Sequence, residues 1–209
     1  MTVNGYDDLA VCNLAVSRVG RRPINSVSSP VTDIEFACAT LYPVAVDTLL
    51  SRHTWKFANP VTELAADADV APIGGYDYAY KLPSDLVAGP YAVYTAADLT
   101  RPISAYIHAN DYIHTSETSC LIRYRRRPAV GIWPVYFVDL VSGDLAMRLA
   151  RTPIINNADL AQALRIEVYG DARLNGEGGA LKDARTADAK TQVNQSFFSN
   201  GDPLTGLVY

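Results

Sequence analysis

The sequence predicts an α+β protein in which the N- and C-terminal segments form one helical bundle and a small antiparallel β-barrel or sandwich is inserted between them. Apolar residues recur at helical intervals at both ends of the chain. Between them, prolines and glycines separate short runs rich in tyrosine and β-branched residues, which is typical of strands and turns. We therefore expect a helical domain at 1–59 and 129–190, an inserted β domain at 60–128 and an extended C-terminal arm at 191–209.

The composition allows one sizeable core and argues against several classes of protein. The 209 residues are 49% hydrophobic, which suits one domain with a large insertion. The formal net charge of −4 argues against a protein that grips nucleic acid electrostatically. Cys12, Cys38 and Cys120 are odd in number and widely spaced, which predicts neither a disulfide framework nor a zinc site. The N-terminus lacks the pattern of a signal peptide and no apolar run looks long enough to cross a bilayer, so we expect a soluble protein without a membrane partner.

Two helices are expected before residue 59. The first, at 6–20, ends at a glycine suited to a C-cap. The second begins at Thr32 or Asp33, with Glu35 in the first turn, where the helix dipole favours negative charge. Pro43 predicts a kink in this helix or a later start. The residues expected on its core-facing side are Ile34, Ala37, Cys38, Leu41, Ala45, Thr48 and Leu49.

Four or five short strands are expected in the β region. The candidates are Tyr76–Tyr80, Tyr91–Tyr94, Ile103–Ile107, Asp111–His114 and Cys120–Tyr124. Alternation sends the rings of Tyr76, Tyr78 and Tyr80 to one face of their strand. Such a face suits either a protein partner or a half-buried sheet, and the residues alone leave both interpretations open.

A basic cluster follows in the last of these strands. If the strand continues, Arg123, Arg125 and Arg127 share one face. This face would meet carboxylates of a neighbouring subunit, a DNA backbone, or solvent along an edge strand, where basic residues prevent unwanted sheet pairing. The candidate interface residues are these three arginines, the three tyrosines, and the aromatic residues of the C-terminal arm: Tyr76, Tyr78, Tyr80, Arg123, Arg125, Arg127, Phe197, Phe198 and Tyr209.

Helical periodicity returns in the last third of the chain. We expect a helix over Phe137–Ala150 and another that begins after Asn157, a good N-cap. Gly170 and the cluster Gly176–Gly179 interrupt this second helix before it resumes at Leu181–Lys190. A flexible joint explains the glycine cluster better than a phosphate cradle does, because no strand precedes it.

The sequence predicts no catalytic, cofactor or metal site. It contains no serine-hydrolase elbow, phosphate-binding loop, zinc-protease helix or dinucleotide fingerprint. His108 and His114 would be metal ligands only if they shared a hairpin face, and they lack a clear carboxylate or cysteine partner. Asp67 and Asp69 are paired carboxylates in a turn, where aspartate is favoured for its own backbone hydrogen bonds. We therefore expect a protein that is not an enzyme.

Several segments carry a resemblance to a known family. They are Leu14–Gly20, Pro23–Ser26, Phe36–Tyr42, Leu49–Arg52, His53–Ala58, Tyr76–Leu86 and the helices from Phe137. The most specific part is Trp-x-Phe-Ala after a helix, followed about twenty residues later by Tyr-x-Tyr-x-Leu-Pro-x-Asp. Trp55 and Phe57 would be apolar anchors where the helical and β regions meet. To about Lys190, the chain resembles the tail tubular protein A family of short-tailed bacteriophages and, more loosely, other head–tail adaptors, or gatekeepers.

The resemblance implies a virion structural protein at the head–tail interface, assembled in the host bacterial cytoplasm. It implies a homo-oligomeric ring, usually dodecameric, that docks beneath the portal protein and offers its other side to the tail tube or nozzle. Double-stranded DNA would pass through the lumen of this connector during ejection without specific binding. The short C-terminal part and the glycine cluster Gly176–Gly179 depart from the family pattern. From the residues alone, a small hydrolase and a carbohydrate-binding module on a helical scaffold remain as alternatives.

Overall fold

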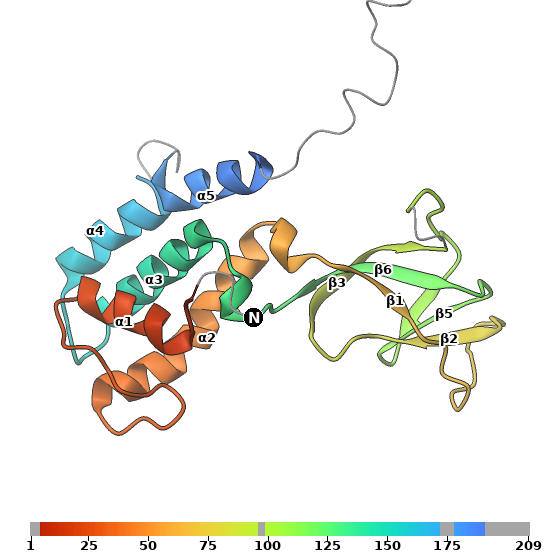
Figure 1. Ribbon diagram of the computed structural model, residues 1–209, viewed down its shortest axis with the longest axis horizontal. Coiled ribbons are helices and arrows are strands. Elements are labelled where there is room, and N and C mark those ends of the chain that lie inside the picture. Colours follow the sequence, from red (N-terminus) through yellow and green to blue (C-terminus); the bar gives the residue numbers. More distant parts are fainter. Residues whose placement is uncertain (1–4, 96–98, 172–177, 191–209) are drawn as a thin grey trace, which may run out of the picture.

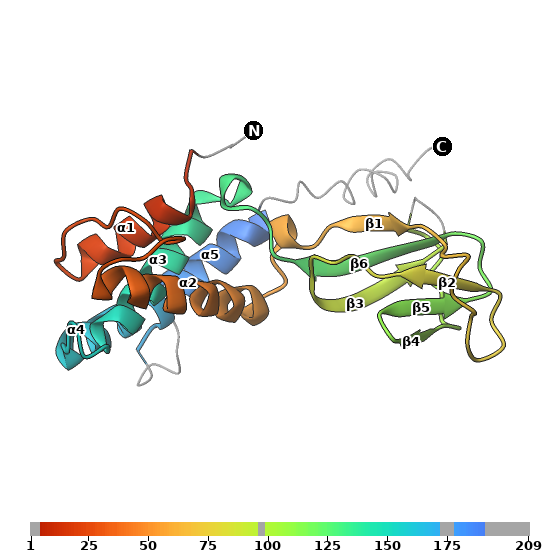
Figure 2. The same ribbon diagram turned by 90° about the horizontal axis from the view of Figure 1, so that it is seen from below.

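The protein has a mixed α+β fold, as the sequence predicts. The computed structural model describes residues 5–95, 99–171 and 178–190. Within these ranges the helices lie before residue 59 and after residue 129, and all named strands lie between them. Figures 1 and 2 show an elongated molecule with the helices (α1–α5, the helical part) at one end and the strands (β1–β6, the β part) at the other. The chain crosses between the two parts next to the short 3₁₀ helices η1 (Lys56–Ala58) and η2 (Val130–Ile132).

Helices α1 and α2 begin at side-chain caps. In α1 (Asp8–Arg18), the Asp7 carboxylate accepts a hydrogen bond from the N–H of Ala10. In α2 (Asp33–Arg52), Thr32 and Glu35 form a capping box. The helix therefore starts at the predicted position and continues through Pro43, so the expected later start is wrong.

The buried Glu35 carboxylate has a larger role than the helix dipole suggested. It accepts hydrogen bonds from the backbone N–H groups of Asn25, Val31 and Thr32, at 3.0, 2.8 and 2.9 Å. These bonds, which favour the charged form, lower the pKa of Glu35 to about 2. Glu35 therefore ties the loop that precedes α2 to the first turn of the helix.

The core-facing side of α2 largely matches the predicted one, because Cys38, Ala45 and Leu49 are fully buried and Ile34, Ala37 and Leu41 pack against the helical core. Ile34, Ala37, Leu41 and Thr48 are only partly buried. The fully buried positions are Glu35, Cys38, Tyr42, Ala45, Val46, Leu49 and Leu50. By length and composition alone α2 could cross a membrane, contrary to our sequence-based expectation, but this is the signature that a core helix of a soluble fold also gives. In this structure α2 packs against α3 and contributes to the helical core.

The remaining helices surround α3. Helix α3 (Val135–Ala150) is buried along most of its length and packs against α1, α2, α4 and α5. Helix α4 (Ala158–Tyr169) begins at Asn157, whose side chain accepts from the N–H of Leu160, and ends at Gly170 with φ +81°, both as predicted. Helix α5 (Gly179–Lys190) begins two residues before the predicted Leu181. These helices share one hydrophobic core.

The strands form two three-stranded antiparallel sheets. Their orders are β1 (Val61–Leu64), β6 (Cys120–Arg126), β3 (Leu86–Tyr94) and β2 (Tyr78–Lys81), β5 (Tyr112–Thr115), β4 (Ile107–Ala109). The predicted strand Ile103–Ile107 is wrong, because β4 only begins at Ile107. Strand β1 was not predicted. Side chains from both sheets, including Tyr80, Ile113 and Ile122, form a second core that is separate from the helical one.

Candidate functional site

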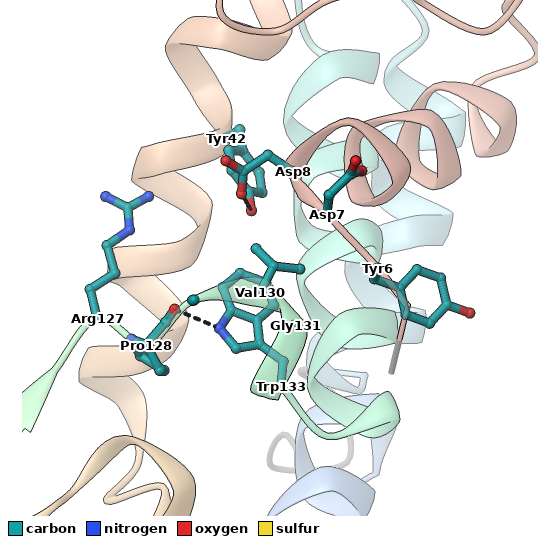
Figure 3. A pocket seen from close by; sticks show the side chains of 10 residues that line it. Tyr6, Asp7, Asp8, Tyr42, Arg127, Pro128, Val130, Gly131 and Trp133 are labelled. Carbon is teal, nitrogen blue, oxygen red and sulfur yellow. Dashed lines mark hydrogen bonds between the residues drawn. The ribbon is translucent and has the colours of Figure 1, made fainter. Parts of the chain in front are cut away.

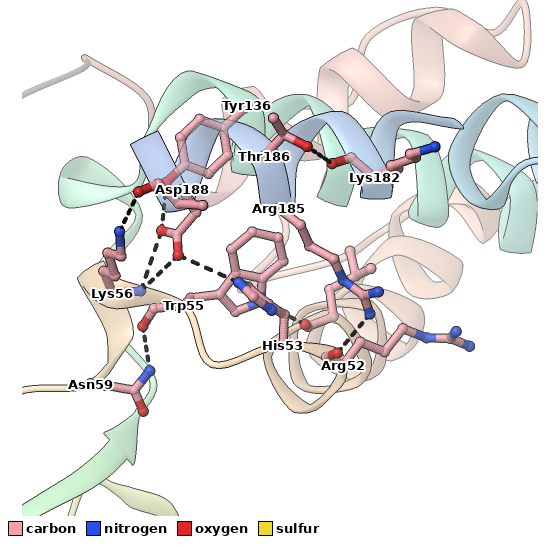
Figure 4. Close-up of polar contacts among 12 residues, drawn as sticks. Arg52, His53, Trp55, Lys56, Asn59, Tyr136, Lys182, Arg185, Thr186 and Asp188 are labelled. Atoms are coloured by element: carbon pink, nitrogen blue, oxygen red, sulfur yellow. Dashed lines mark hydrogen bonds and ion pairs between the residues drawn. The ribbon is translucent and has the colours of Figure 1, made fainter. Parts of the chain in front are cut away.

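A buried carboxylate organises the end of the helical part that adjoins the β part (Figure 4). Asp188, near the C-terminal end of α5, is only 1% exposed. Its oxygens accept hydrogen bonds from the backbone N–H of Lys56, at 3.3 and 3.2 Å, and from the Tyr136 hydroxyl, at 2.9 Å. The Nε2 atom of His53 lies 3.5 Å from Asp188 Oδ2. One side chain thus joins α5 to η1, to the start of α3 and to the end of α2.

The pKa values of two groups beside Asp188 are shifted. Burial, followed by the hydrogen bond to Asp188, raises the pKa of Tyr136. Burial lowers the pKa of His53, and the attraction of Asp188 opposes this shift. Carboxylate, imidazole and phenol resemble the parts of a general acid–base site. The carboxylate also accepts from the backbone N–H of Lys56, so the same contacts tie α5 to η1 and to α3.

Trp55 lies at the same junction. It is packed in the helical core, which agrees with its predicted role as an apolar anchor. It is fully buried, and its Nε1 donates a hydrogen bond to the carbonyl of Leu49 at 2.8 Å. Its ring stacks on Tyr136 and meets Phe137 edge to face, with centroids 6.2 and 5.2 Å apart. Phe57 packs partly buried against the same core. The chain therefore leaves the helical part through a rigid aromatic cluster.

A cleft of about 510 Å³ lies between α1, α2 and the segment before α3 (Figure 3). Within it, the Tyr42 hydroxyl donates to Asp8 Oδ1 at 2.7 Å, and burial raises the pKa of Tyr42. Arg127 forms an ion pair with Asp47 at 3.5 Å. Trp133 Nε1 donates to a backbone carbonyl at the back of the cleft. These polar groups serve contacts within the chain, and we assign no chemistry to the cleft.

The three tyrosine candidates differ in burial: Tyr80 is fully buried, and Tyr76 and Tyr78 are half-buried. Tyr80 is 1% exposed, and its hydroxyl donates to the carbonyl of Glu117 at 2.7 Å. Tyr78 is half-buried against the same core, and its ring centroid lies 6.2 Å from that of Tyr80. Tyr76 precedes β2, so the predicted three-residue stripe is interrupted. Tyr80 is therefore a core residue and offers no surface to a partner.

The arginine candidates do not share an exposed face. Strand β6 lies between β1 and β3, so the interpretation as a solvated edge strand is wrong. Arg123 is exposed, whereas Arg125 is 7% exposed and its guanidinium carbon lies 5.4 Å from the centroid of the Tyr91 ring. Arg127 lies after the strand and pairs with Asp47 of α2. Arg123 and Arg127 are therefore exposed, and Arg127 is already engaged within the chain.

Sheet register separates the two histidines. In the β4–β5 hairpin, His114 pairs with Ile107 and His108 pairs with Ile113. Since paired residues share a face and successive residues alternate, the two imidazoles point to opposite faces. The hypothesis of a shared metal-binding face is therefore wrong. His114 is buried and its Nδ1 accepts from the N–H of Ile73, at 3.5 Å, while His108 is exposed.

The acidic pair in the turn follows the predicted backbone pattern. Asp67 Oδ1 accepts a hydrogen bond from the N–H of Asp69 at 3.1 Å, which confirms the local turn interpretation. Its other oxygen accepts from the Tyr112 hydroxyl at 3.0 Å. Over the described ranges, no group of three or more His, Cys, Asp or Glu side chains is placed to hold a metal ion. The remaining candidates, Phe197, Phe198 and Tyr209, lie outside the described residues.

Sequence reasoning missed the buried carboxylates Asp188 and Asp144. A signal exists for the first, because Leu181, Ala184 and Asp188 are spaced as one helix face and all are buried. An aspartate at a core-facing position requires a partner within the fold, and its identity depends on the tertiary structure.

The chain matches no protein-family model, and no curated protein matches it either.

Proposed function

We propose that the chain is a head–tail adaptor of a tailed bacteriophage, a virion structural protein and not an enzyme. In this proposal the five helices form a bundle that builds a homo-oligomeric, dodecameric ring beneath the portal protein. The β part, a small sandwich of two sheets, faces the tail tube or nozzle. Double-stranded DNA passes through the lumen. The predicted C-terminal arm at 191–209 lies outside the described residues.

The observation that carries this proposal is a set of exposed apolar side chains on α2 and just before it. Phe36 and Val44 lie two helical turns apart and are 54% and 48% exposed, and Val31 just before the helix is 83% exposed. Beside Phe36 is a groove of about 540 Å³ that includes Leu41 and Ile154. An exposed Phe36 at the edge of an apolar groove, with further exposed valines on the same segment, favours contact with another protein surface.

In a ring, the same contact is repeated between each pair of neighbouring subunits. In a closed ring each subunit uses the same two surfaces, so modest interfaces add up around the assembly. The net charge of −4 suits a lumen through which DNA slides without being held. The combination of Trp-x-Phe-Ala with Tyr-x-Tyr-x-Leu-Pro-x-Asp supports the placement of this ring at the portal through the family resemblance.

The test is to mix the purified chain with its cognate portal protein and to image the mixture by electron microscopy. We expect rings of the chain on one end of the portal. The double variant Phe36→Ser/Val44→Ser should lose this decoration. The matched control Val87→Ser, at an exposed valine of β3 that is 42% exposed, should keep it. Folded wild-type protein that forms neither rings nor portal complexes would refute the proposal.

A further inference from the structure

A concave basic pocket of about 290 Å³ lies where the C-terminal halves of α2, α3 and α4 meet. Its lining consists of four arginines with a carboxylate, a phenol and a methionine: Arg52, Arg148, Arg151, Arg165, Asp144, Tyr169 and Met147. The lining comes from three separate segments of the chain, and only the packing of the three helices brings these segments together. The pocket is separate from the junction around Asp188 and from the exposed apolar side chains of α2.

The single carboxylate in the lining is already engaged within the fold. Asp144 is fully buried, and it accepts hydrogen bonds from Arg148 Nε at 2.7 Å and from the Tyr169 hydroxyl at 2.6 Å. It compensates one of the four positive charges. The lining therefore retains three uncompensated guanidinium charges in a chain whose net charge is negative.

Two of the arginines are held in place by neighbouring groups. The guanidinium carbon of Arg52 lies 4.5 Å from the centroid of the Tyr169 ring. The Nη2 of Arg148 donates to the Thr48 hydroxyl at 3.2 Å, in addition to its bond to Asp144. These contacts orient the two guanidinium groups before any ligand arrives, which reduces the entropy lost on binding.

The other two arginines are not engaged in this way. Over the described ranges, Arg151 and Arg165 form no ion pair. Arg18, by contrast, contacts both Asp139 and Glu167. The pocket thus contains two guanidinium groups whose charge is available to a ligand.

The positions of three of the four arginines are explained by the C-terminal ends of helices. Arg52 ends α2, Arg148 is in the last turn of α3, and Arg151 caps α3, where positive charge interacts favourably with the helix dipole. This does not explain Arg165, which lies one turn before the end of α4. It also does not explain why all four side chains border one concavity.

We propose that this pocket binds a phosphate group. A phosphate dianion offers several oxygens to guanidinium groups, which bind it through paired N–H donors. Inorganic phosphate carries up to two charges and a phosphodiester of the DNA backbone carries one, and either presents tetrahedrally arranged oxygens to several guanidinium groups, where a carboxylate presents two oxygens in one plane. The group comes either from free inorganic phosphate or from the backbone of double-stranded DNA. The site goes beyond the proposed adaptor function and stands without it.

The test removes the two available arginines and keeps the buried network. The variant Arg151→Gln/Arg165→Gln leaves Asp144 and its partners intact. The matched control Arg22→Gln/Arg101→Gln removes the same charge from exposed positions outside the pocket. Inorganic phosphate is titrated calorimetrically into each protein at fixed ionic strength. We expect the affinity to fall at least about tenfold in the pocket variant and to change by less than about twofold in the control.

A second arm identifies the source of the phosphate. Binding of a fluorescent DNA duplex is followed by anisotropy, and inorganic phosphate is added as a competitor. Binding that depends on the pocket arginines, weakens with salt and is displaced by phosphate identifies the DNA backbone as the source. Phosphate binding without duplex binding identifies free phosphate.

Equal phosphate affinity in the wild type and the pocket variant would overturn the proposal. It would also be overturned if only self-association of the chain depended on the pocket arginines, since the site would then receive a carboxylate of a second copy. A protein that binds phosphate here but fails to decorate portal rings would refute the adaptor function alone.

Discussion

Asp188→Ala is the substitution from which we expect the largest loss of stability at the junction. The change removes the acceptor of the Tyr136 hydroxyl and of the Lys56 N–H group, with all of these atoms in the interior or close to it. Hydrogen bonds to a charged acceptor contribute about 1.5–3 kcal/mol each. The cost of burying the carboxylate already offsets part of this gain, so we take the lower end and expect a loss of about 3 kcal/mol in the free energy of unfolding.

Urea denaturation followed by tryptophan fluorescence measures this loss in the correct part of the molecule. Trp55 and Trp133 are buried in the helical core, so their emission reports on the helices and not on the sheets. The matched control is Asp183→Ala, at an exposed position of the same helix. We expect the control to be as stable as the wild type, or slightly more so, because alanine favours helix. Equal midpoints for the two variants would show that the Asp188 contacts do not hold α5 in place.

Three further substitutions test other contacts. The carboxylate of Glu35, whose pKa is lowered from 4.5 to about 2, stabilises the folded state above pH 4.5 and loses this effect as the pH falls through about 2. The difference in urea midpoint between wild type and Glu35→Gln should therefore shrink over this range, and a pH-independent difference would contradict the reasoning. In Gly143→Ala the new Cβ would lie 2.8 Å from a methyl group of Val168. Overpacking of about 1–3 kcal/mol, partly offset by helix propensity, should lower the melting temperature, and an unchanged value would argue against close packing of α3 on α4. Tyr80→Phe keeps the buried ring but loses one hydrogen bond, which should cost about 1 kcal/mol by thermal circular dichroism, whereas Tyr76→Phe should cost nothing measurable.

Local signals in the sequence predicted the helix ends well. The start of α2 at Thr32, the start of α4 at Asn157 and its end at Gly170 all depend on hydrogen bonds or backbone angles within about four residues along the chain. The same locality explains why the turn at Asp67 was predicted. The alternation of helical and strand-like segments also sufficed for the α+β class.

Patterns that depend on facing partners were predicted less well. The predicted side of α2 does face the core, but the sequence does not predict that Glu35, Tyr42, Val46 and Leu50 are also fully buried, because the packing partner α3 selects which residues are covered. The alternation over Tyr76–Tyr80 predicts one face, but the strand begins only at Tyr78. The Cys12 and Cys38 side chains, widely separated in sequence, interact in the core, and the Cys38 thiol and burial raise the pKa of Cys12.

The sequence by itself determined where most helices begin and end, because caps and turns are contacts between near neighbours in the chain. Only the tertiary structure decided that β6 is a central strand, that His108 and His114 face apart, and which buried groups surround Asp188. It alone gathered the four arginines of the basic pocket from three helices. The physical reason is that sheet register and helix packing join residues from distant parts of the chain, and no local spacing specifies those partners.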